Sequence, residues 1–455
     1  MMKEMSLRNI ATAVKGKYYG NPDKMDLRVS GVAIDSRKIE QGYLFVPIKG
    51  ARVDGHTFIP QVMEKGALCT LSEKNIEGYD YILVDSCEQA LKDLAEYYRS
   101  VLDIKVVGIT GSVGKTSTKE MIASVLSQKY SVLKTAGNFN NEIGLPLTIF
   151  NIRNEHEIAV LEMGISDFGE MSRLAKMARP DICVITNIGL CHLENLGDRD
   201  GILKAKTEMF AYRQPHAKII LNGEDDKLAT VKEWDGCEPI YFGLSDEQDA
   251  YADEIQSLSL KGTSCTLHLG EDEIKVVIPI PGHHMVYNAL AGALVGRELG
   301  LTAKEIQAGI ESLVPVSGRN NLIETESLLV IDDCYNANPI SMKASLDVLA
   351  TADSRKVAIL GDMFELGENE KQLHYEVGVH AADKKIDLVI CIGELSKETA
   401  KGVASGDSKV CYFETKAAFL KEADGLLQKN DAILVKASHG MEFPEIVEYL
   451  KTICL

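Results

Sequence analysis

Residues 106–116 read VVGITGSVGKT. The apolar run Val106–Thr110 predicts a buried strand, and the apolar spacing over Lys115–Gln128 predicts a helix. Between them, glycines let the backbone curl so that its N–H groups face inward, and the start of the helix adds the positive end of its dipole. A strand, a glycine-rich turn and a helix in this order predict a loop that cradles phosphate groups within a parallel α/β sheet.

The Lys-Thr pair at the end of this loop favours a triphosphate with Mg²⁺. Lys115 would reach the β- and γ-phosphates, and the hydroxyl of Thr116 would ligate the metal. Five residues separate Gly108 from Gly114, where the general pattern has four, so the loop is a variant spaced G-x-x-G-x-x-G-K-T. The alternative is a glycine-rich turn without a ligand. We predict that ATP contacts Gly111, Ser112, Gly114, Lys115, Thr116 and Ser117.

Alternating strands and helices on both sides of the loop predict an α/β protein with three domains. At about 150 residues per domain, 455 residues suggest about three. Residues 1–102 mix short strands with helices such as 87–101 and predict a small α/β N-terminal domain. Residues 103–316 predict a central P-loop domain with a mostly parallel sheet. The Pro and Gly of residues 315–319 predict a hinge, after which residues 317–455 alternate again and predict a Rossmann-like C-terminal domain.

Individual strands are predicted from short apolar runs. An antiparallel pair is expected at residues 259–267 and 273–278, added to the central sheet. The central sheet also takes 158–162, 182–186 and 219–221. The C-terminal sheet takes 328–331, 357–360, 388–392, 410–412 and 432–435.

Composition excludes several classes of protein. The 49 Lys and Arg against 67 Asp and Glu give a net charge of −18, and there is no basic tail, which disfavours nucleic-acid binding. The ten cysteines are scattered without a CxxC pair, which disfavours zinc and redox motifs. The first residues lack the apolar run of a signal peptide, and no window reaches the ~20 apolar residues of a membrane span. We expect a cytoplasmic protein without stable membrane insertion.

Polar residues downstream of the loop are candidates for a metal and substrate site. Glu162 ends one predicted strand, and His192 follows the next at the same edge, where ligand crevices of open α/β sheets form. Each also has a plain structural reading, as a solvated strand end or a structural histidine. Lys206 lies on a predicted helix, where a solvated face is the default. The amides at 138–141 either close turns or orient a polar substrate.

Taken together, these stretches resemble the Mur ligase family, the ATP-dependent amide-forming enzymes of peptidoglycan precursor synthesis. The loop Thr110–Thr116 matches the family's phosphate loop, including its spacing. The resemblance is greatest to the branch of the family that adds D-alanyl-D-alanine. The branch that adds diaminopimelate or lysine usually has a DNPR-like signature in its last domain, and this sequence has none. The stretches that carry this choice are GNFNNEIGLPLT (137–148), TNIGLCHLENLG (186–197), DDCYNANPISMKASL (332–346) and LGDMFELG (360–367).

The resemblance implies roles for individual residues. Catalysis would depend on Lys115, Glu162, His192 and Lys206. Mg²⁺ would be held by Thr116, Glu162, His192 and, if it is carbamylated, Lys206; a carbamate turns this cation into an anionic ligand and forms on the neutral amine. Further nucleotide contacts would come from Asn288, at the adenine, and from Arg319, Asp333, Tyr335 and Asn336. Substrate would contact Ser36, Arg37, Phe45, Asn138 and Asn141.

Two stretches depart from the family pattern. His283-His284-Met285 stands where Arg-His-Asn is frequent, and His439 replaces a frequent Arg in Lys436–Gly440. The second departure puts a charge-based role at this position in doubt.

The implied reaction joins D-alanyl-D-alanine to UDP-N-acetylmuramoyl-tripeptide through an acyl phosphate, with ATP and Mg²⁺, and we expect a monomer. The sequence leaves open whether the third peptide residue is lysine or diaminopimelate. Alternatives are a related ligase with another acceptor, such as a folylpolyglutamate synthetase or the diaminopimelate-adding branch, and a nucleotide-gated interaction protein without catalysis.

Overall fold

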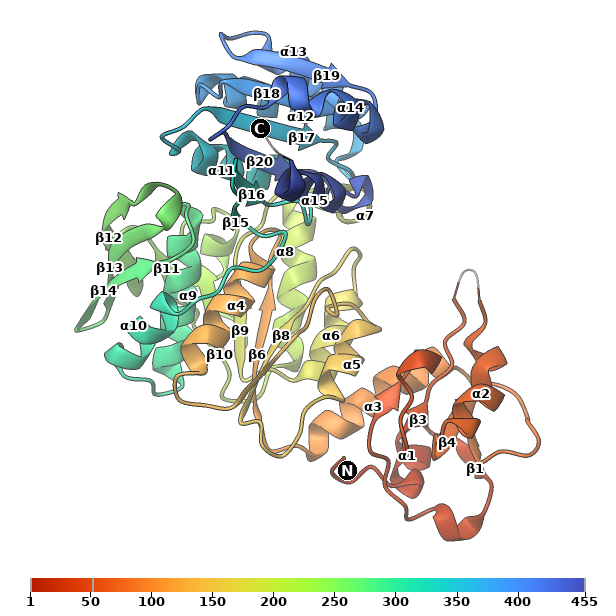
Figure 1. Cartoon of the computed structure of the whole chain (residues 1–455). Coiled ribbons are helices and arrows are strands. Elements are labelled where there is room, and N and C mark those ends of the chain that lie inside the picture. The colour runs from red at the N-terminus through yellow and green to blue at the C-terminus, as the bar shows by residue number, and fades with distance from the viewer. Residues whose placement is uncertain (1, 51–52, 454–455) are drawn as a thin grey trace. The chain divides into compact units, whose positions relative to one another are not determined.

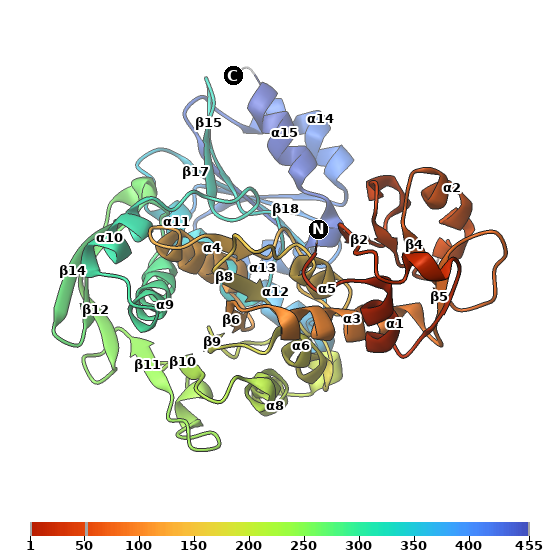
Figure 2. The same cartoon turned by 90° about the horizontal axis from the view of Figure 1, so that it is seen from below.

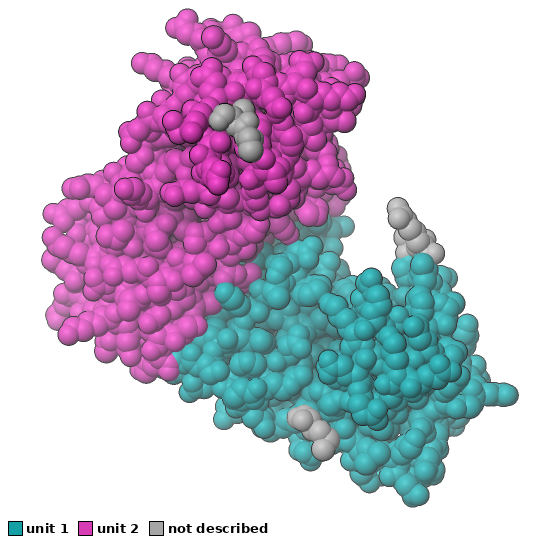
Figure 3. Space-filling model, in the orientation of Figure 1, with its two compact units in different colours: residues 1–110, 130–184, 205–219 teal, residues 111–129, 185–204, 220–455 magenta. Residues whose placement is uncertain are grey.

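The computed structural model describes residues 2–50 and 53–453 and, within them, contains three β-sheets (Figure 1). The chain divides into two compact units, shown in different colours in Figure 3. Unit 1 consists of residues 1–110, 130–184 and 205–219, and unit 2 of residues 111–129, 185–204 and 220–455. Within the described ranges, no helix has the length and apolar character that a membrane span requires.

The N-terminal sheet has five strands in the order β1-β5-β4-β3-β2. Only β1 runs antiparallel to its neighbour. The strands are β1 (Lys17–Tyr19), β2 (Val32–Ala33), β3 (Leu44–Phe45), β4 (Cys69–Ser72) and β5 (Tyr81–Leu83), and the helices are α1 (Leu7–Ala13), α2 (Ile59–Glu64) and α3 (Cys87–Val101). The strands are short because each apolar run is short, and the predicted helix 87–101 is confirmed with the same bounds.

The central sheet has nine strands in the order β14-β13-β12-β11-β10-β9-β6-β8-β7. Its strands are β6 (Lys105–Thr110), β7 (Val132–Lys134), β8 (Ile158–Glu162), β9 (Ile182–Ile185), β10 (Lys218–Asn222), β11 (Ile240–Gly243), β12 (Ala250–Ser257), β13 (Thr263–Leu269) and β14 (Asp272–Ile278). Its helices are α4 (Lys115–Leu126), α5 (Gly144–Ile149), α6 (Glu170–Ala178), α7 (Leu193–Leu196), α8 (Arg199–Thr207), α9 (His284–Glu298) and α10 (Ala303–Glu311). The parallel pairing of β6 with β8 is the predicted arrangement, and β7, which was not predicted, pairs in parallel with β8.

The predicted antiparallel pair is present, but its first strand begins later than expected. Residues 259–261 form a short turn, and the hairpin consists of β13 and β14. A third antiparallel strand, β12, was not predicted, because a register shift between Asp253 and Gln256 interrupts its alternation. Helices α9 and α10 pack against these strands, as Figure 2 shows.

The C-terminal sheet has six strands in the order β15-β16-β20-β17-β18-β19, and all but β15 are parallel. The strands are β15 (Asn321–Glu324), β16 (Leu329–Asp332), β17 (Lys356–Gly361), β18 (Leu388–Ile392), β19 (Lys409–Phe413) and β20 (Ala432–Lys436). The helices are α11 (Pro339–Ala350), α12 (Glu370–Asp383), α13 (Ser396–Val403), α14 (Lys416–Leu426) and α15 (Pro444–Thr452). This is the doubly wound, Rossmann-like arrangement that the sequence predicts.

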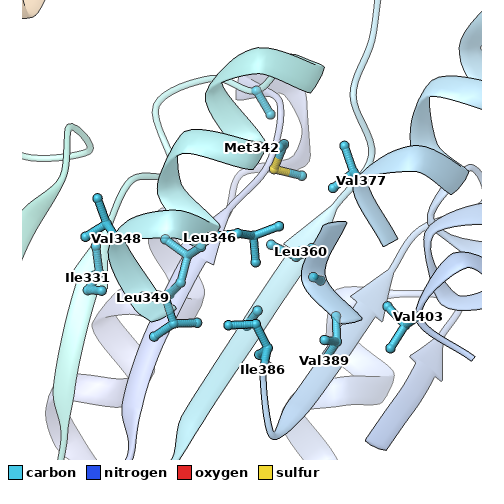
Figure 4. Close-up of a cluster of buried hydrophobic side chains, with 14 of the residues drawn as sticks. Ile331, Met342, Leu346, Val348, Leu349, Leu360, Val377, Ile386, Val389 and Val403 are labelled. Carbon is cyan, nitrogen blue, oxygen red and sulfur yellow. The ribbon is translucent and has the colours of Figure 1, made fainter. Parts of the chain in front are cut away.

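Both faces of the C-terminal sheet are covered, which explains its continuous apolar strands. Successive residues of β17 belong to different cores: Ala358 and Leu360 pack with α11, α12 and α13, and Val357 and Ile359 pack with α14 and α15. Figure 4 shows the first of these cores, where Leu346 from α11 lies among strand and helix side chains.

One buried histidine fixes the loop after β17. His374 has no exposed surface; its Nε2 accepts the N–H of Met363 at 2.9 Å, and its Nδ1 lies 2.7 Å from the carbonyl of Glu370. Burial lowers the pKa of His374 below its ordinary value, because the charged form loses its hydration. The neutral ring is therefore the form that the folded protein holds.

We expect His374 to make folding pH-dependent. As the pH falls through about 6.5, the unfolded chain gains a proton at this residue before the folded chain does, so the free energy of unfolding falls by up to about 1.4 kcal/mol per pH unit. His374→Gln keeps an acceptor without a charge and should reduce this loss. Denaturant unfolding of both proteins at pH 7.5 and 5.5 measures it, and an equal loss in the two would contradict the assignment.

Candidate active site

The phosphate loop, residues 111–114, has the curled backbone that its glycines predict. Gly111 and Gly114 take positive φ angles of 149° and 82°. A side chain at Gly111 is also excluded by space, because its Cβ would lie 2.0 Å from the hydroxyl of Thr186. Lys115 begins α4, and its Nζ donates to the carbonyls of Gly111 at 2.8 Å and Ser112 at 3.2 Å. The lysine lies folded over the loop, where phosphate oxygens would replace these carbonyls as its partners.

Thr116 and Arg319 are in contact although 203 residues separate them in the chain. Nη2 of Arg319 donates to Oγ1 of Thr116 at 3.1 Å, and the guanidinium lies 4.0 Å from the centroid of the Tyr335 ring. The ring of His439 lies 5.5 Å from that of Tyr335. The structure therefore holds a permanent positive charge beside the first turn of α4, where the negative charge of a polyphosphate would be bound.

Asp333 and Asn336 follow β16 and are held by other parts of the C-terminal sheet. Oδ1 of Asp333 accepts the N–H of Asn320 at 3.1 Å, and its Oδ2 accepts from Ser345 and Lys436, each at 2.5 Å. Nζ of Lys436 also donates to the carbonyl of Asn336 at 3.1 Å. Both oxygens of Asp333 thus have protein donors. A direct contact of Asp333 with nucleotide stays a prediction.

A small pocket lies beside the first turn of α4. Its walls combine hydroxyl, charged and apolar side chains: Thr116, Ser117, Glu120, Ile280, Met285, Leu313, Val314, Val316 and Arg319. Asn288, predicted at the adenine, lies nearby on α9, where its Oδ1 accepts from Thr118 at 2.9 Å. Sequence reasoning missed the apolar walls, because they come from separate segments without a shared motif.

In unit 1, Glu162 ends β8 and is paired with Ile109 of β6, just before the phosphate loop begins. The side chain is buried, with 2% of its surface exposed. Its Oε1 accepts from Nδ2 of Asn140 at 2.9 Å, and its N–H donates to the hydroxyl of Thr135 at 3.0 Å. Glu162 is therefore an oriented, buried carboxylate, and Asn140, one of the amides whose role the sequence left open, orients it.

The other two asparagines of this segment differ from each other. Oδ1 of Asn141 accepts the N–H groups of Ile143 at 3.2 Å and Gly144 at 2.8 Å, at the start of α5. The oxygen of Asn141 thus closes a turn, one of the two roles that the sequence left open. Asn138 is exposed. Substrate contacts of both residues stay predictions.

His192 and Lys206 complete the predicted metal set. His192 has a left-handed backbone (φ 50°) before α7, and its Nδ1 lies 3.1 Å from a carboxylate oxygen of Glu365. Lys206 lies on α8 with 1% of its surface exposed, so the default of a solvated lysine is wrong. Glu162 and Lys206 belong to unit 1, and Lys115, Thr116 and His192 to unit 2. Their convergence on one metal therefore stays a prediction.

The oxygen donors of this set fit Mg²⁺, whereas His192 would add a nitrogen donor. A buried carboxylate at Glu162 and a hydroxyl at Thr116 are hard oxygen ligands, which Mg²⁺ prefers alongside phosphate oxygens. The primary amine of Lys206 would fit only as its carbamate.

The N-terminal candidates divide into surface and core. Arg37 is exposed and paired with Asp35 at 2.8 Å, and hydrogen bonding from Arg37 lowers the pKa of Asp35 to about 2. The carbonyl of Ser36 accepts from Lys65 at 2.9 Å. Phe45 is fully buried in the core of this sheet, which gives its side chain a packing role. No contact of these residues with a substrate is tested, so their binding roles stay predictions.

Comparisons with known proteins agree along the whole chain. Residues 28–99 match "Mur ligase family, catalytic domain", residues 109–296 match "Mur ligase middle domain", and residues 318–439 match "Mur ligase, glutamate ligase domain". The UDP-N-acetylmuramoyl-tripeptide--D-alanyl-D-alanine ligase of Bacillus subtilis (strain 168) is 39% identical, covering 99% of both chains. The ligase of the same name from Escherichia coli (strain K12) is 33% identical, again over 99% of both.

Solved structures give the same result. A crystal structure of MurF from Acinetobacter baumannii has a TM-score of 0.92 at 31% identity, covering 99% of this chain and 100% of that one. MurF ligase from Thermotoga maritima, in complex with ADP, has a TM-score of 0.81 at 31% identity, covering 92% and 97%. A Mycobacterium tuberculosis folylpolyglutamate synthase, at 15% identity and a TM-score of 0.63 over 81% of this chain and 95% of that one, shares the fold alone.

Proposed function

Because the chain belongs to the Mur ligase family, we propose that it joins D-alanyl-D-alanine to UDP-N-acetylmuramoyl-tripeptide at the expense of ATP. The observation that carries the proposal is the identity of 39%, over 99% of both chains, to a ligase of that name. The reaction belongs to peptidoglycan precursor synthesis, on which cell-wall growth, cell shape and division depend.

The reaction has two steps. A carboxylate oxygen of the peptide attacks the γ-phosphorus of ATP, the bond between the β–γ bridging oxygen and that phosphorus breaks, and ADP leaves with the electron pair. The amine of D-alanyl-D-alanine then attacks the carbonyl carbon of the acyl phosphate. The new C–N bond forms, the C–O bond to phosphate breaks with its electron pair on the phosphate oxygen, and the departing phosphate takes up the amine proton. Water must be excluded, because it would hydrolyse the acyl phosphate.

The chain's own groups offset the repulsion between two anionic reactants. Lys115 and the N–H groups at the start of α4 bind the phosphates, and Arg319 adds a second cation beside Thr116. Thr116, Glu162, His192 and carbamylated Lys206 would hold Mg²⁺, which neutralises phosphate charge when bound. Most of the remaining catalysis is positioning of the three substrates.

We assign these tasks to three modules: residues 1–102 bind the UDP-sugar, 103–316 bind ATP, and 317–455 close on the nucleotide through the hinge at Gly318. Asn138 and Asn141 would orient the peptide, and Asn288 the adenine. The protein would act as a cytoplasmic monomer. The tripeptide of its UDP-linked substrate carries lysine or diaminopimelate at the third position.

The test is release of ADP and phosphate from ATP with UDP-muramoyl-tripeptides of both kinds, in the presence of D-alanyl-D-alanine or of single amino acids. The proposal expects release only with the dipeptide. Release with a single amino acid identifies a ligase with another acceptor, and nucleotide binding without substrate-dependent release identifies a nucleotide-gated interaction protein.

A further inference from the structure

We propose that Asn187 is a positioning residue that shapes the phosphate loop through Val113, without itself contacting the nucleotide. The kinetic part of this proposal rests on the function proposed above, but its structural part concerns nucleotide binding alone.

A glycine-rich loop needs partners outside itself, because its own residues have neither side-chain packing nor a regular hydrogen-bond pattern to hold one conformation. Asn187 provides them for Val113. The N–H of Val113 donates to Oδ1 of Asn187 at 2.9 Å, and Nδ2 of Asn187 donates to the carbonyl of Val113 at 3.0 Å. An amide offers one acceptor and one donor side by side, so a single side chain satisfies both backbone groups of this residue.

Asn187 belongs to a segment, residues 186–189, that is bonded to the loop at several points. Oγ1 of Thr186 donates to the same Val113 carbonyl at 2.6 Å. The N–H of Ser112 donates to the carbonyl of Asn187 at 3.0 Å, and the Ser112 hydroxyl bonds both the N–H and the carbonyl of Gly189, at 2.8 and 3.2 Å. Together these contacts determine which N–H groups of the loop remain available to phosphate.

The segment is itself held from its other side. Oδ2 of Asp225 accepts the N–H of Ile188 at 2.8 Å, and Nε of Arg199 donates to the carbonyl of Ile188 at 2.8 Å. The side chain of Asp225 is only 8% exposed. Ile188, the neighbour of Asn187, is thus held by groups outside the loop. This holds Asn187 in place, and its two hydrogen bonds in turn hold Val113 in place. His192, a predicted metal ligand, lies three positions beyond Gly189 in the chain.

The experiment compares Asn187→Ala, Thr186→Val, the double variant and a stability control, Thr415→Ala. Thr415 caps α14 at the far edge of the C-terminal sheet and touches no site residue named above. ADP affinity is measured by titration calorimetry, and KM is measured for each substrate. We expect Asn187→Ala to raise the Kd of ADP and the KM of ATP about 10- to 100-fold, because the partly buried N–H of Val113 loses its partner. The KM values of both other substrates should change by less than about twofold.

Thr186→Val should have a smaller effect, because the Val113 carbonyl keeps Asn187 as a donor. In the double variant this carbonyl loses both donors, so the rise in Kd should exceed the product of the two single effects. Thr415→Ala should lower the melting temperature and leave ADP affinity unchanged. Hydrogen exchange of the Val113 amide should accelerate in Asn187→Ala without nucleotide, but not in Thr186→Val.

Wild-type ADP affinity in Asn187→Ala, or an equal change in the KM of all substrates, overturns the proposal. If Asn187→Ala does not fold, Asn187→Ser, which is too short to span both groups of Val113, provides the same comparison. If the wild-type protein binds ADP but shows no dipeptide-dependent phosphate release, the proposed ligase function fails, and the ADP titrations still decide the role of Asn187.

Discussion

Replacing Lys115 with alanine is expected to lower kcat by at least about 10³-fold, equivalent to about 4 kcal/mol of transition-state stabilisation. Other cations that neutralise charge during phosphoryl transfer contribute 10³–10⁵ to kcat. In the structure, Nζ of Lys115 already lies over the loop at 2.8 Å from the Gly111 carbonyl, so it needs only to exchange partners when phosphate binds. Single-turnover phosphate release at saturating ATP measures the effect on the chemical step.

The matched control is Lys129→Ala. Lys129 is exposed just beyond the C-terminal end of α4 and donates to the carbonyl of Gly300, so its loss removes one positive charge at the end of the helix that is farther from the loop. We expect near wild-type turnover. A Lys115→Ala protein with unchanged melting temperature and more than a tenth of wild-type kcat would contradict the proposed mechanism.

Replacing Lys206 with arginine is expected to lower kcat about 10²- to 10³-fold, the range for loss of one group that stabilises developing charge. Arginine keeps the positive charge but cannot become a carbamate, so the loss would identify an anion as the working form. Lys206→Glu carries a carboxylate and should retain more activity than Lys206→Arg. The arginine and glutamate side chains must each fit a position where only 1% of the lysine surface is exposed. Melting temperatures are therefore measured alongside kcat, to separate loss of folding from loss of catalysis.

The carbamate itself has a direct readout. Protein equilibrated with ¹³C-bicarbonate should show a carbamate carbon resonance in the NMR spectrum of the wild type and none in Lys206→Arg. Lys204→Arg, on the exposed side of the same helix, should keep both the resonance and the activity. Equal kcat values for the wild type and Lys206→Arg would mean that Lys206 is not a carbamylated ligand.

Sequence patterns predicted the bounds of helices and strands correctly where a single signal, such as amphipathic spacing or an apolar run, marks the element. Helix 87–101 and strands 158–162 and 388–392 were predicted with the bounds observed, because amphipathic spacing or an unbroken apolar run marks them. Strand β12 was missed because its charged residues and register shift erase the alternation. The structure places the side chain of Phe45 in the core of the N-terminal sheet, which the motif did not reveal, and its predicted contact with substrate stays a prediction.

The amino-acid sequence alone determined the class of fold and the position of the phosphate loop, and it identified Lys115 and Thr116 as the polar residues that end this loop. It could do so because the strand, the glycines and the helix are neighbours in the chain. Only the tertiary structure decided that Arg319 reaches Thr116, that Asn140 orients Glu162, and that Asn187 holds Val113. Those contacts join segments that are distant in sequence, and strand order and helix packing, not spacing along the chain, bring them together.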